Sequence, residues 1–134
     1  MTDVCMIIGA GAGIGGHVGK RFAAEGYHAA LCRRSDQQGL DQMVSEIEAA
    51  GGQASGHLLN AVDEGAIEKL IDEVEADIGP INILVYNLGA QIGNRSLADT
   101  PLKTFELGWR MGTLCLFRVA QKLFPKMVER GGGA

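Results

Sequence analysis

The sequence predicts an α/β fold built around a parallel β-sheet, and two observations lead to this prediction. Segments with the apolar character of strands alternate strictly with segments that carry a helical repeat, four times along the 134-residue chain. The first of these segments, residues 4–8, is continuously apolar, as strands are when both faces of a parallel sheet are covered. Strict alternation of this kind indicates strands joined by right-handed helical crossovers.

The first half of the chain supplies three of the predicted strands. After the strand at 4–8, apolar residues recur every four positions from Ile14 to Phe22, which predicts a helix that ends at a glycine, residue 26. A second strand is expected at 28–32. One apolar face over residues 40–47 then predicts a second helix, which stops at two consecutive glycines and leads to a weak third strand at 53–59.

The second half of the chain repeats the pattern once more. Apolar residues from Ile67 to Ile78 keep helical spacing, and a Gly-Pro pair ends that helix. Residues 81–85 form the fourth predicted strand, and residues 90–99 are predicted to be a polar loop. Because no fifth strand follows, the fourth strand is expected to leave an open sheet edge, which invites pairing or aggregation.

A long helix is predicted for the last part of the chain. Thr100 offers a side-chain N-cap, and Pro101 suits the first helical position. From there the helix is expected to run towards Arg130, with a break near Pro125. Aromatic side chains on this helix, such as Trp109 and Phe117, are interpreted as core or interface residues.

Length, composition and charge limit the possible functions. A chain of 134 residues with 46% hydrophobic and 21% charged residues is expected to be one folded domain over residues 1–134. A net charge of −4 gives no broad attraction to nucleic acid, and no apolar run is long enough to span a membrane. Three scattered cysteines and no signal-peptide pattern indicate reduced thiols, no metal site and a cytoplasmic location.

Charge is distributed unevenly along the sequence. Residues 60–80 carry seven acids and one base, whereas residues 101–134 carry six bases and two acids. We interpret both segments as solvated helix faces, which is the usual role of such runs. On this interpretation neither segment marks a binding site for a charged partner.

A glycine-rich segment with the sequence GAGAGIGG occupies residues 9–16, between the first predicted strand and the first helix. Glycine permits a tight turn and a close approach of backbone N–H groups to a phosphate, and the helix N-terminus adds further unpaired donors. Two registers fit: G-x-G-x-x-G begins at Gly11, and G-x-x-x-G-x-G begins at Gly9. The second is preferred because its first glycine directly follows the strand.

Other classes of glycine loop fit less well. A P-loop is excluded, because Ile14 stands at the place of its first glycine and Arg21 at the place of its Ser or Thr. A methyltransferase that uses S-adenosylmethionine usually has an acid at the end of the second strand, but here Cys32 is followed by Arg33 and Arg34. An acid at this position selects NAD, whereas arginine accommodates the 2′-phosphate of NADP. The sequence therefore predicts NADP as the cofactor, with NAD less favoured.

These motifs resemble the short-chain dehydrogenase/reductase family, over the whole chain but only the N-terminal half of the family's fold. Asn60 and Ala61 fall where the family contacts adenine, and residues 86–89 are similar to its Asn-Asn-Ala-Gly segment. The resemblance implies a Rossmann-type, doubly wound parallel sheet, truncated after the fourth strand–helix unit. The cofactor contacts predicted from the glycine loop, the arginines and the resemblance are Gly9, Gly11, Gly13, Ile14, Gly15, Arg33, Arg34, Asn60, Ala61, Asn87 and Gly89.

The family's chemistry uses a Tyr-x-x-x-Lys pair, in which the tyrosine exchanges a proton while hydride moves to or from nicotinamide. Neither Tyr27 nor Tyr86 has a lysine four positions later. The resemblance therefore implies the NADP(H)-binding portion of an oxidoreductase for carbonyl or alcohol substrates, with no catalytic residue in this chain. The alternative is a non-catalytic nucleotide sensor or partner subunit, which would form an oligomer through the helix at 101–130.

Three further side chains are candidate functional residues. His17 lies on the first predicted helix and could approach a cofactor diphosphate, although a partly exposed histidine without that role is preferred. Cys32 adjoins two arginines, which could lower its pKa, but a buried strand-end cysteine is the preferred interpretation. Tyr86 stands at the carboxyl edge of the predicted sheet, where ligands bind in such folds.

Overall fold

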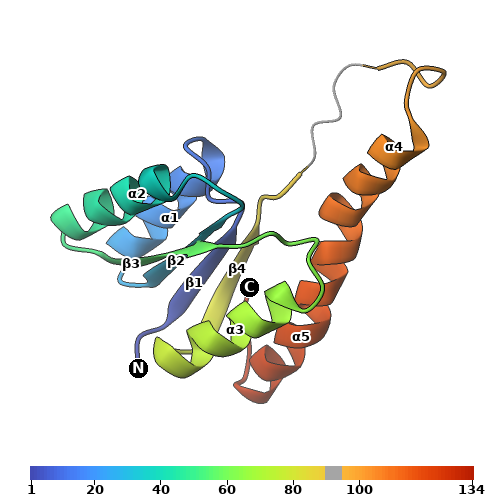
Figure 1. Ribbon diagram of the computed structural model, residues 1–134. Coiled ribbons are helices and arrows are strands. Elements are labelled where there is room, and N and C mark those ends of the chain that lie inside the picture. Colours follow the sequence, from blue (N-terminus) through green and yellow to red (C-terminus); the bar gives the residue numbers. More distant parts are fainter. Residues whose placement is uncertain (90–94) are drawn as a thin grey trace.

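The computed structural model describes residues 1–89 and 95–134 and confirms the predicted fold (Figure 1). One parallel sheet has the strand order β3-β2-β1-β4. The strands are β1 (Val4–Ile8), β2 (His28–Arg33), β3 (Gln53–Leu58) and β4 (Ile81–Tyr86). The helices are α1 (Ile14–Ala24), α2 (Gln37–Ala49), α3 (Ala66–Asp77), α4 (Leu102–Trp109) and α5 (Cys115–Glu129).

All four predicted strands coincide with β1 to β4 to within one residue at each end. The chain winds from β1 outwards to β2 and β3, and it then returns to place β4 on the other side of β1. The sheet is therefore doubly wound, as the family resemblance implies. Of the predicted polar loop at 90–99, the first five residues lie outside the described part of the chain.

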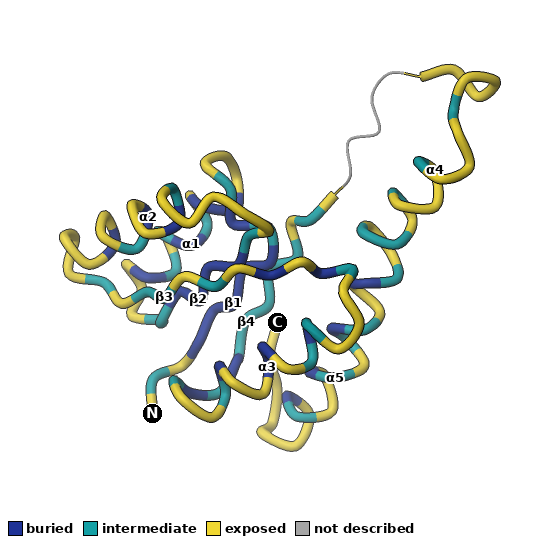
Figure 2. The backbone as a smooth tube through the Cα atoms, viewed as in Figure 1, coloured by how far each residue is buried: buried dark blue, intermediate teal, exposed yellow. Residues whose placement is uncertain are grey.

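Helices cover both faces of the sheet, with α1 and α2 on one side and α3 and α5 on the other (Figure 1). Every residue of β1 is buried (Figure 2), because this strand is flanked on both edges and covered on both faces. Alternate residues point to opposite sides. Val4, Met6 and Ile8 join an apolar cluster with α3 and α5, whereas Cys5 and Ile7 join a second cluster with α1 and α2.

The last helical segment differs from the prediction in two respects. Pro101, and not Thr100, is the N-cap of α4, and the Thr100 hydroxyl donates to a carbonyl of the preceding loop instead. The helix also continues through Pro125, which lies on the exposed side of α5. Its irregularity is a π-helical turn, η1 (Arg110–Leu114), where the Tyr86 hydroxyl donates to the Met111 carbonyl oxygen. The turn separates α4, which has no buried residue, from α5, which has a buried stripe.

The outer edge of β4 is paired at one point by the last residue of the chain. The N–H of Ala134 donates to the Asn82 carbonyl oxygen at 2.9 Å, and the Leu84 N–H donates to the Ala134 carbonyl oxygen at 2.7 Å. In a parallel ladder, one residue bonds in this way to positions i and i+2 of the neighbouring strand. The predicted open edge is therefore closed at this point, and the rest of that edge has no strand partner among residues 1–89 and 95–134.

Large apolar side chains remain exposed on α4 and α5. Phe105 and Phe117 are 64% and 60% exposed, and Trp109 is 50% exposed, so these aromatic residues do not belong to the core. A wide apolar groove on α5 is lined by Phe117, Ala120, Gln121, Phe124, Pro125, Val128 and Glu129. Across the two described ranges, no helix combines the length and the apolarity that crossing a membrane requires.

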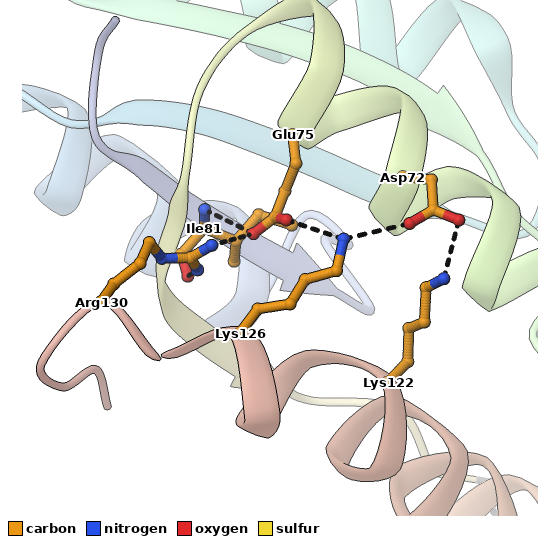
Figure 3. Close-up of polar contacts among 6 residues, drawn as sticks. All are labelled: Asp72, Glu75, Ile81, Lys122, Lys126 and Arg130. Carbon is orange, nitrogen blue, oxygen red and sulfur yellow. Dashed lines mark hydrogen bonds and ion pairs between the residues drawn. The ribbon is translucent and has the colours of Figure 1, made fainter. Parts of the chain in front are cut away.

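Acids of α3 pair with bases of α5, so the two charged segments are paired helix faces as well as solvated ones: Asp72 is 53% exposed, whereas Glu75 is only 12% exposed. Figure 3 shows the Lys126 ammonium between Asp72, at 3.1 Å, and Glu75, at 3.0 Å. Arg130 also binds Glu75, at 2.9 Å, and Lys122 binds Asp72, at 2.7 Å. Hydrogen bonds from Lys122 and Lys126 hold the pKa of the Asp72 carboxyl below its ordinary value. These contacts fasten the two helices that cover one face of the sheet.

Candidate functional site

The carboxyl ends of β1 and β4 lie side by side at the point where the winding of the sheet changes direction. Ligands of open α/β sheets bind outside the carboxyl ends of the strands at such a point. β1 leads into Gly9, whose φ of +97° is a conformation that favours glycine. The N–H groups of Gly9 and Ala10 both donate to the Cys32 carbonyl oxygen, at 2.9 and 2.8 Å, which pins the glycine loop to the end of β2.

Asn87 joins the same loop to the end of β4. Its backbone N–H donates to the Ile8 carbonyl oxygen at 2.8 Å, and its side-chain Nδ2 donates to the Gly9 carbonyl oxygen at 3.3 Å. A Cβ added at Gly9 would lie 2.5 Å from the Asn87 carbonyl oxygen. The loop and the β4 end therefore need glycine at position 9 for their close approach as well as for its φ.

The glycines of the loop fall into two groups by what surrounds them. A Cβ on Gly15 would lie 2.1 Å from the Gly9 carbonyl oxygen, and one on Gly16 would lie 2.5 Å from the Gly11 carbonyl oxygen. By contrast, a Cβ on Gly11 or Gly13 would meet nothing within 4 Å. Gly15 and Gly16 thus allow α1 to pack on the loop, whereas Gly11 and Gly13 leave open space beside the start of the helix.

The N-terminus of α1 presents backbone N–H groups beside the glycine loop. Gly13 is the N-cap, without a side-chain cap. Among the described residues, the N–H groups of residues 12–15 have no acceptor, and the first paired amide is that of Gly16, bonded to the Gly11 carbonyl oxygen at 2.8 Å. The Ile14 side chain is 72% exposed, and the first turn holds no acid. Free amides at a helix N-terminus fit a phosphate group.

Beside the loop lies a hollow of about 290 Å³ that we call the strand-end hollow. It lies where β1, β2 and β3 end, so three strand ends and the glycine loop share it. Its lining contains five of the predicted cofactor contacts, which are Gly9, Gly11, Arg33, Arg34 and Ala61. The remaining lining residues are Ile8, Cys32, Ser35, Asp36, Leu59 and Leu88.

Asn60 and Gly89, two other predicted contacts, do not line the strand-end hollow. The Asn60 side-chain amide donates to the Asp63 carboxylate at 3.2 Å, and the Asn60 side-chain oxygen accepts no hydrogen bond from residues 1–89 or 95–134. Gly89 is exposed, and a Cβ there would meet nothing within 4 Å. Both residues follow strands at the same edge of the sheet as the glycine loop.

Sequence analysis missed Arg118 of α5, which fastens the loop after β3. Its guanidinium donates to the carbonyl oxygens of Ala61, at 2.9 Å, and Asp63, at 3.1 Å. It also forms a two-point pair with the Glu68 carboxylate, at 3.0 and 2.7 Å, which holds the pKa of Glu68 below its ordinary value. Arg118 lies 57 positions from Ala61 in the sequence, so no local pattern could have indicated this contact.

Asp36 is the second residue that sequence analysis missed. It lines the strand-end hollow and lies 3.4 Å from Arg33, measured between Oδ2 and Nη1. It is also the N-cap of α2, where its Oδ1 accepts the Gly39 N–H at 3.0 Å. Asp is a preferred N-cap residue and accepts the N–H group three positions later. This preference was a signal in the sequence that could have identified Asp36 as the cap of α2.

The three further candidates have structural contacts. Cys32 is buried, and burial raises its pKa to about 12, so its thiol stays protonated beside the arginines. Burial likewise raises the pKa of Tyr86 to about 12, and its hydroxyl bonds η1. His17 is exposed, with its Nδ1 2.8 Å from the Gly13 carbonyl oxygen. None of these contacts indicates a group prepared for acid–base or nucleophilic chemistry.

Comparison with known proteins places this arrangement in a family. The family model described as short chain dehydrogenase matches residues 3–134. A fatty acyl-CoA reductase of Acinetobacter baylyi is 32% identical over 132 residues, which cover 97% of this chain and 44% of that protein. A 7alpha-hydroxysteroid dehydrogenase of Escherichia coli is 31% identical over 130 residues, which cover 96% of this chain and 50% of that protein.

The solved structures give the same result. A crystal structure of an actinorhodin polyketide ketoreductase with NADPH superimposes with a TM-score of 0.89 at 28% identity, covering 98% of this chain and 51% of that one. The chain thus spans about half the length of the relatives it matches. With the family model matched from residue 3 to residue 134, this chain belongs to the short-chain dehydrogenase family.

Proposed function

We propose that this chain is the NADP(H)-binding portion of a short-chain oxidoreductase that transfers hydride between nicotinamide and a carbonyl or alcohol substrate. The observation that carries the proposal is the start of α1, where the amides of residues 12–15 lack acceptors among the described residues. Gly11 and Gly13 leave the adjoining space open. In this proposal, residues 1–134 form one dinucleotide-binding domain without the catalytic half of the fold.

Each part of a dinucleotide has residues that fit it. Amides of residues 12–15 would bind the diphosphate, because they are donors at a helix N-terminus. The adenosine would occupy the strand-end hollow, with Ala61 in its wall, and the adenine amino group would reach beyond that lining to the side-chain oxygen of Asn60 as its acceptor. The nicotinamide would extend towards Asn87 and Gly89, which follow β4.

We favour NADP over NAD because two arginines follow β2. Arg33 lines the hollow with a side chain only 19% exposed, and Arg34 is an exposed residue that also lines it. A guanidinium is always charged and matches the geometry of a phosphate with two parallel N–H donors. The similar ketoreductase was solved with NADPH, which supports the same choice here.

Bound NADP(H) would supply the hydride, and this chain would bind and orient the cofactor. Its 134 residues contain no Tyr-x-x-x-Lys pair. Tyr86 is not a replacement, because its hydroxyl already donates to the Met111 carbonyl oxygen and burial raises its pKa to about 12. We therefore expect the 134-residue chain to bind NADP(H) without turning over a substrate.

The same proposal includes a substrate class and a location. Relatives at 32% and 31% identity are named as an acyl-CoA reductase and a hydroxysteroid dehydrogenase, which supports a carbonyl or alcohol substrate. Cys5, Cys32 and Cys115 are all buried and unpaired. Unpaired thiols are typical of reducing compartments, which supports the cytoplasm.

A thermal-shift titration with NADPH and NADH tests the proposal. At 100 times its dissociation constant, NADPH should add about 2.7 kcal/mol to stability and raise Tm by roughly 5–15 °C. NADH at the same concentration should give a smaller rise, and replacing Arg33 and Arg34 together with glutamine should remove the difference. Equal shifts with both nucleotides in the unaltered chain would contradict the NADP preference, and no shift with either would contradict nucleotide binding.

The exposed apolar face of α4 and α5 favours a second candidate function, a non-catalytic nucleotide sensor or partner subunit that forms a homo-oligomer. Phe105, Phe117 and Val128 on this face are each at least 60% exposed. Exposed apolar patches of this kind mark interaction surfaces. Light scattering after size exclusion should then show a dimer that Phe117→Ser converts to a monomer, and a monomeric unaltered chain would contradict this candidate.

A further inference from the structure

Asp36 holds an unusual position directly beside the arginine that the proposed function assigns to the 2′-phosphate. Its φ of +68° makes it the one non-glycine residue with positive φ within residues 1–89 and 95–134. Such a conformation is uncommon outside glycine, although Asp and Asn adopt it more readily than other residues. The surrounding contacts must therefore hold the Asp36 backbone in place.

Two contacts fix the Asp36 carboxylate. Oδ1 accepts the Gly39 N–H at 3.0 Å and so caps α2, while Oδ2 lies 3.4 Å from Nη1 of Arg33. The cap and the ion pair use different oxygens of one carboxylate. Its negative charge is consequently held next to the guanidinium, in a side chain that is 56% exposed.

Gly39 provides an independent indication that this pair is built into the fold. A Cβ at Gly39 would lie 2.4 Å from Oδ2 of Asp36 and 2.8 Å from Nη1 of Arg33. Glycine inside the first turn of a helix costs stability relative to alanine. The glycine leaves the space that the carboxylate and the guanidinium occupy.

Asp36 and Arg33 also share their surroundings. Both line the strand-end hollow, and both line a second hollow of about 270 Å³ between α1 and α2. Arg34, by contrast, lines only the first hollow and makes no ion pair with any described residue. A phosphate that approaches Arg33 therefore meets the Asp36 carboxylate at the same place.

We infer that Asp36 is a specificity-determining residue that narrows the preference of this site for NADP(H) over NAD(H). The inference rests on the proposed function. A 2′-phosphate carries close to two negative charges and is repelled by the carboxylate that already neutralises Arg33. The 2′-hydroxyl of NAD(H) is neutral and can donate to a carboxylate, so the same side chain disfavours one cofactor and accommodates the other.

The deciding variant is Asp36→Asn, because asparagine tolerates a positive φ and still caps a helix. Calorimetric titration should show NADPH binding about tenfold more tightly than to the unaltered chain, the effect of removing one nearby charge. NADH should bind within about threefold of its original affinity, since it lacks the repelled phosphate. The NADPH gain should shrink at high salt, which screens the repulsion.

Asp41→Asn is the matched control, because Asp41 lies on the helix that Asp36 caps, carries the same charge and lines neither hollow. It should leave both affinities unchanged. Asp36→Gly is the second variant, since glycine accepts the positive φ and also removes the charge. It should tighten NADPH selectively as well.

The outcomes separate this inference from the proposed function. If NADPH binds the unaltered chain and depends on Arg33, but neither Asp36 variant changes the ratio of NADPH to NADH affinity, the inference alone is overturned. Equal tightening of both nucleotides, or the same gain in Asp41→Asn, overturns it too. If neither nucleotide binds the folded, unaltered chain, the proposed function is overturned and this inference with it.

Discussion

Gly15→Ala should destabilise the chain by about 3 kcal/mol, which is at the upper end of the cost of overpacking. The added Cβ would lie 2.1 Å from the Gly9 carbonyl oxygen and 3.0 Å from the Cα of Ala10. Both contacts are backbone atoms, so no side chain can rotate away to relieve them. Either α1 must shift from the loop or the loop must leave the end of β2.

The loop cannot move cheaply, because three further contacts hold it. The Gly9 and Ala10 amides bond the Cys32 carbonyl oxygen, and Asn87 bonds the Gly9 carbonyl oxygen. A displaced α1 would also lose the packing of Gly16 against the Gly11 carbonyl oxygen. We therefore expect Tm to fall by about 10 °C and NADPH binding to be lost together with the loop geometry.

Gly11→Ala is the matched control for Gly15→Ala. It makes the same chemical change in the same loop, but its Cβ would meet nothing within 4 Å. Its unfolding free energy should stay within about 0.5 kcal/mol of the unaltered chain, as for a surface substitution. Urea denaturation of both variants decides the matter, and a Gly15 variant as stable as the Gly11 variant would show that the loop relaxes around the new methyl group.

The strands and the glycine loop could be predicted because their signals are local. A buried parallel strand such as residues 4–8 is a contiguous apolar run, and it stands next to its own glycine motif. The structure shows why glycine stands at these positions. Gly9 and Gly15 allow close contacts between backbone atoms, whereas Gly13 leaves open space beside the start of α1. The spacing of the glycines predicted the loop, but only their neighbours in the structure show which role each glycine has.

The errors at the long helix have a common physical cause. A π-helical turn adds one residue to a turn, and apolar spacing before and after residues 110–114 still looks helical. Pro125 was expected to break the helix because it removes one N–H donor. It lies on the exposed side of α5, where water can bond the carbonyl that loses its partner, and the helix therefore continues.

Contacts between distant segments could not be predicted from spacing. The acids of α3 and the bases of α5 each look like an exposed face, and only the packing of both helices on one side of the sheet brings them together. Asp72 and Lys122 are 50 positions apart. The same holds for Arg118, whose partners precede it by 50 to 57 positions.

Arg118→Met should cost about 3 kcal/mol of unfolding free energy, because it removes several charge-assisted bonds from a largely buried group at once. The Arg118 side chain is 19% exposed and donates to two backbone carbonyls and to the Glu68 carboxylate. Methionine keeps the length and the apolar stem of the side chain. The carbonyl oxygen of Ala61 would keep only the weak Cys115 thiol donor, at 3.2 Å.

Nucleotide affinity should fall with this stability, since Arg118 anchors the loop that carries Asn60 and Ala61. A loop released from α5 must be ordered again when adenine binds, and the cost of ordering reduces the observed affinity. We expect NADPH to bind several-fold more weakly, on the order of the effect of immobilising one or two side chains. Arg118→Lys should recover only part of both losses, because an ammonium cannot reproduce the forked donors of a guanidinium.

Lys122→Met distinguishes this role from a general effect of charge on α5. Lys122 lies one helical turn after Arg118. Among the described residues its ammonium bonds only the 53%-exposed Asp72, so its removal should cost a small part of what the Arg118 substitution costs. The affinity for NADPH should not change, because Lys122 does not touch the loop after β3. Equal losses in the Lys122 and Arg118 variants would mean that the ion pairs between α3 and α5, and not the carbonyl bonds of Arg118, hold that loop. A loss confined to Arg118 would instead show that the long helix positions the adenine side of the site directly.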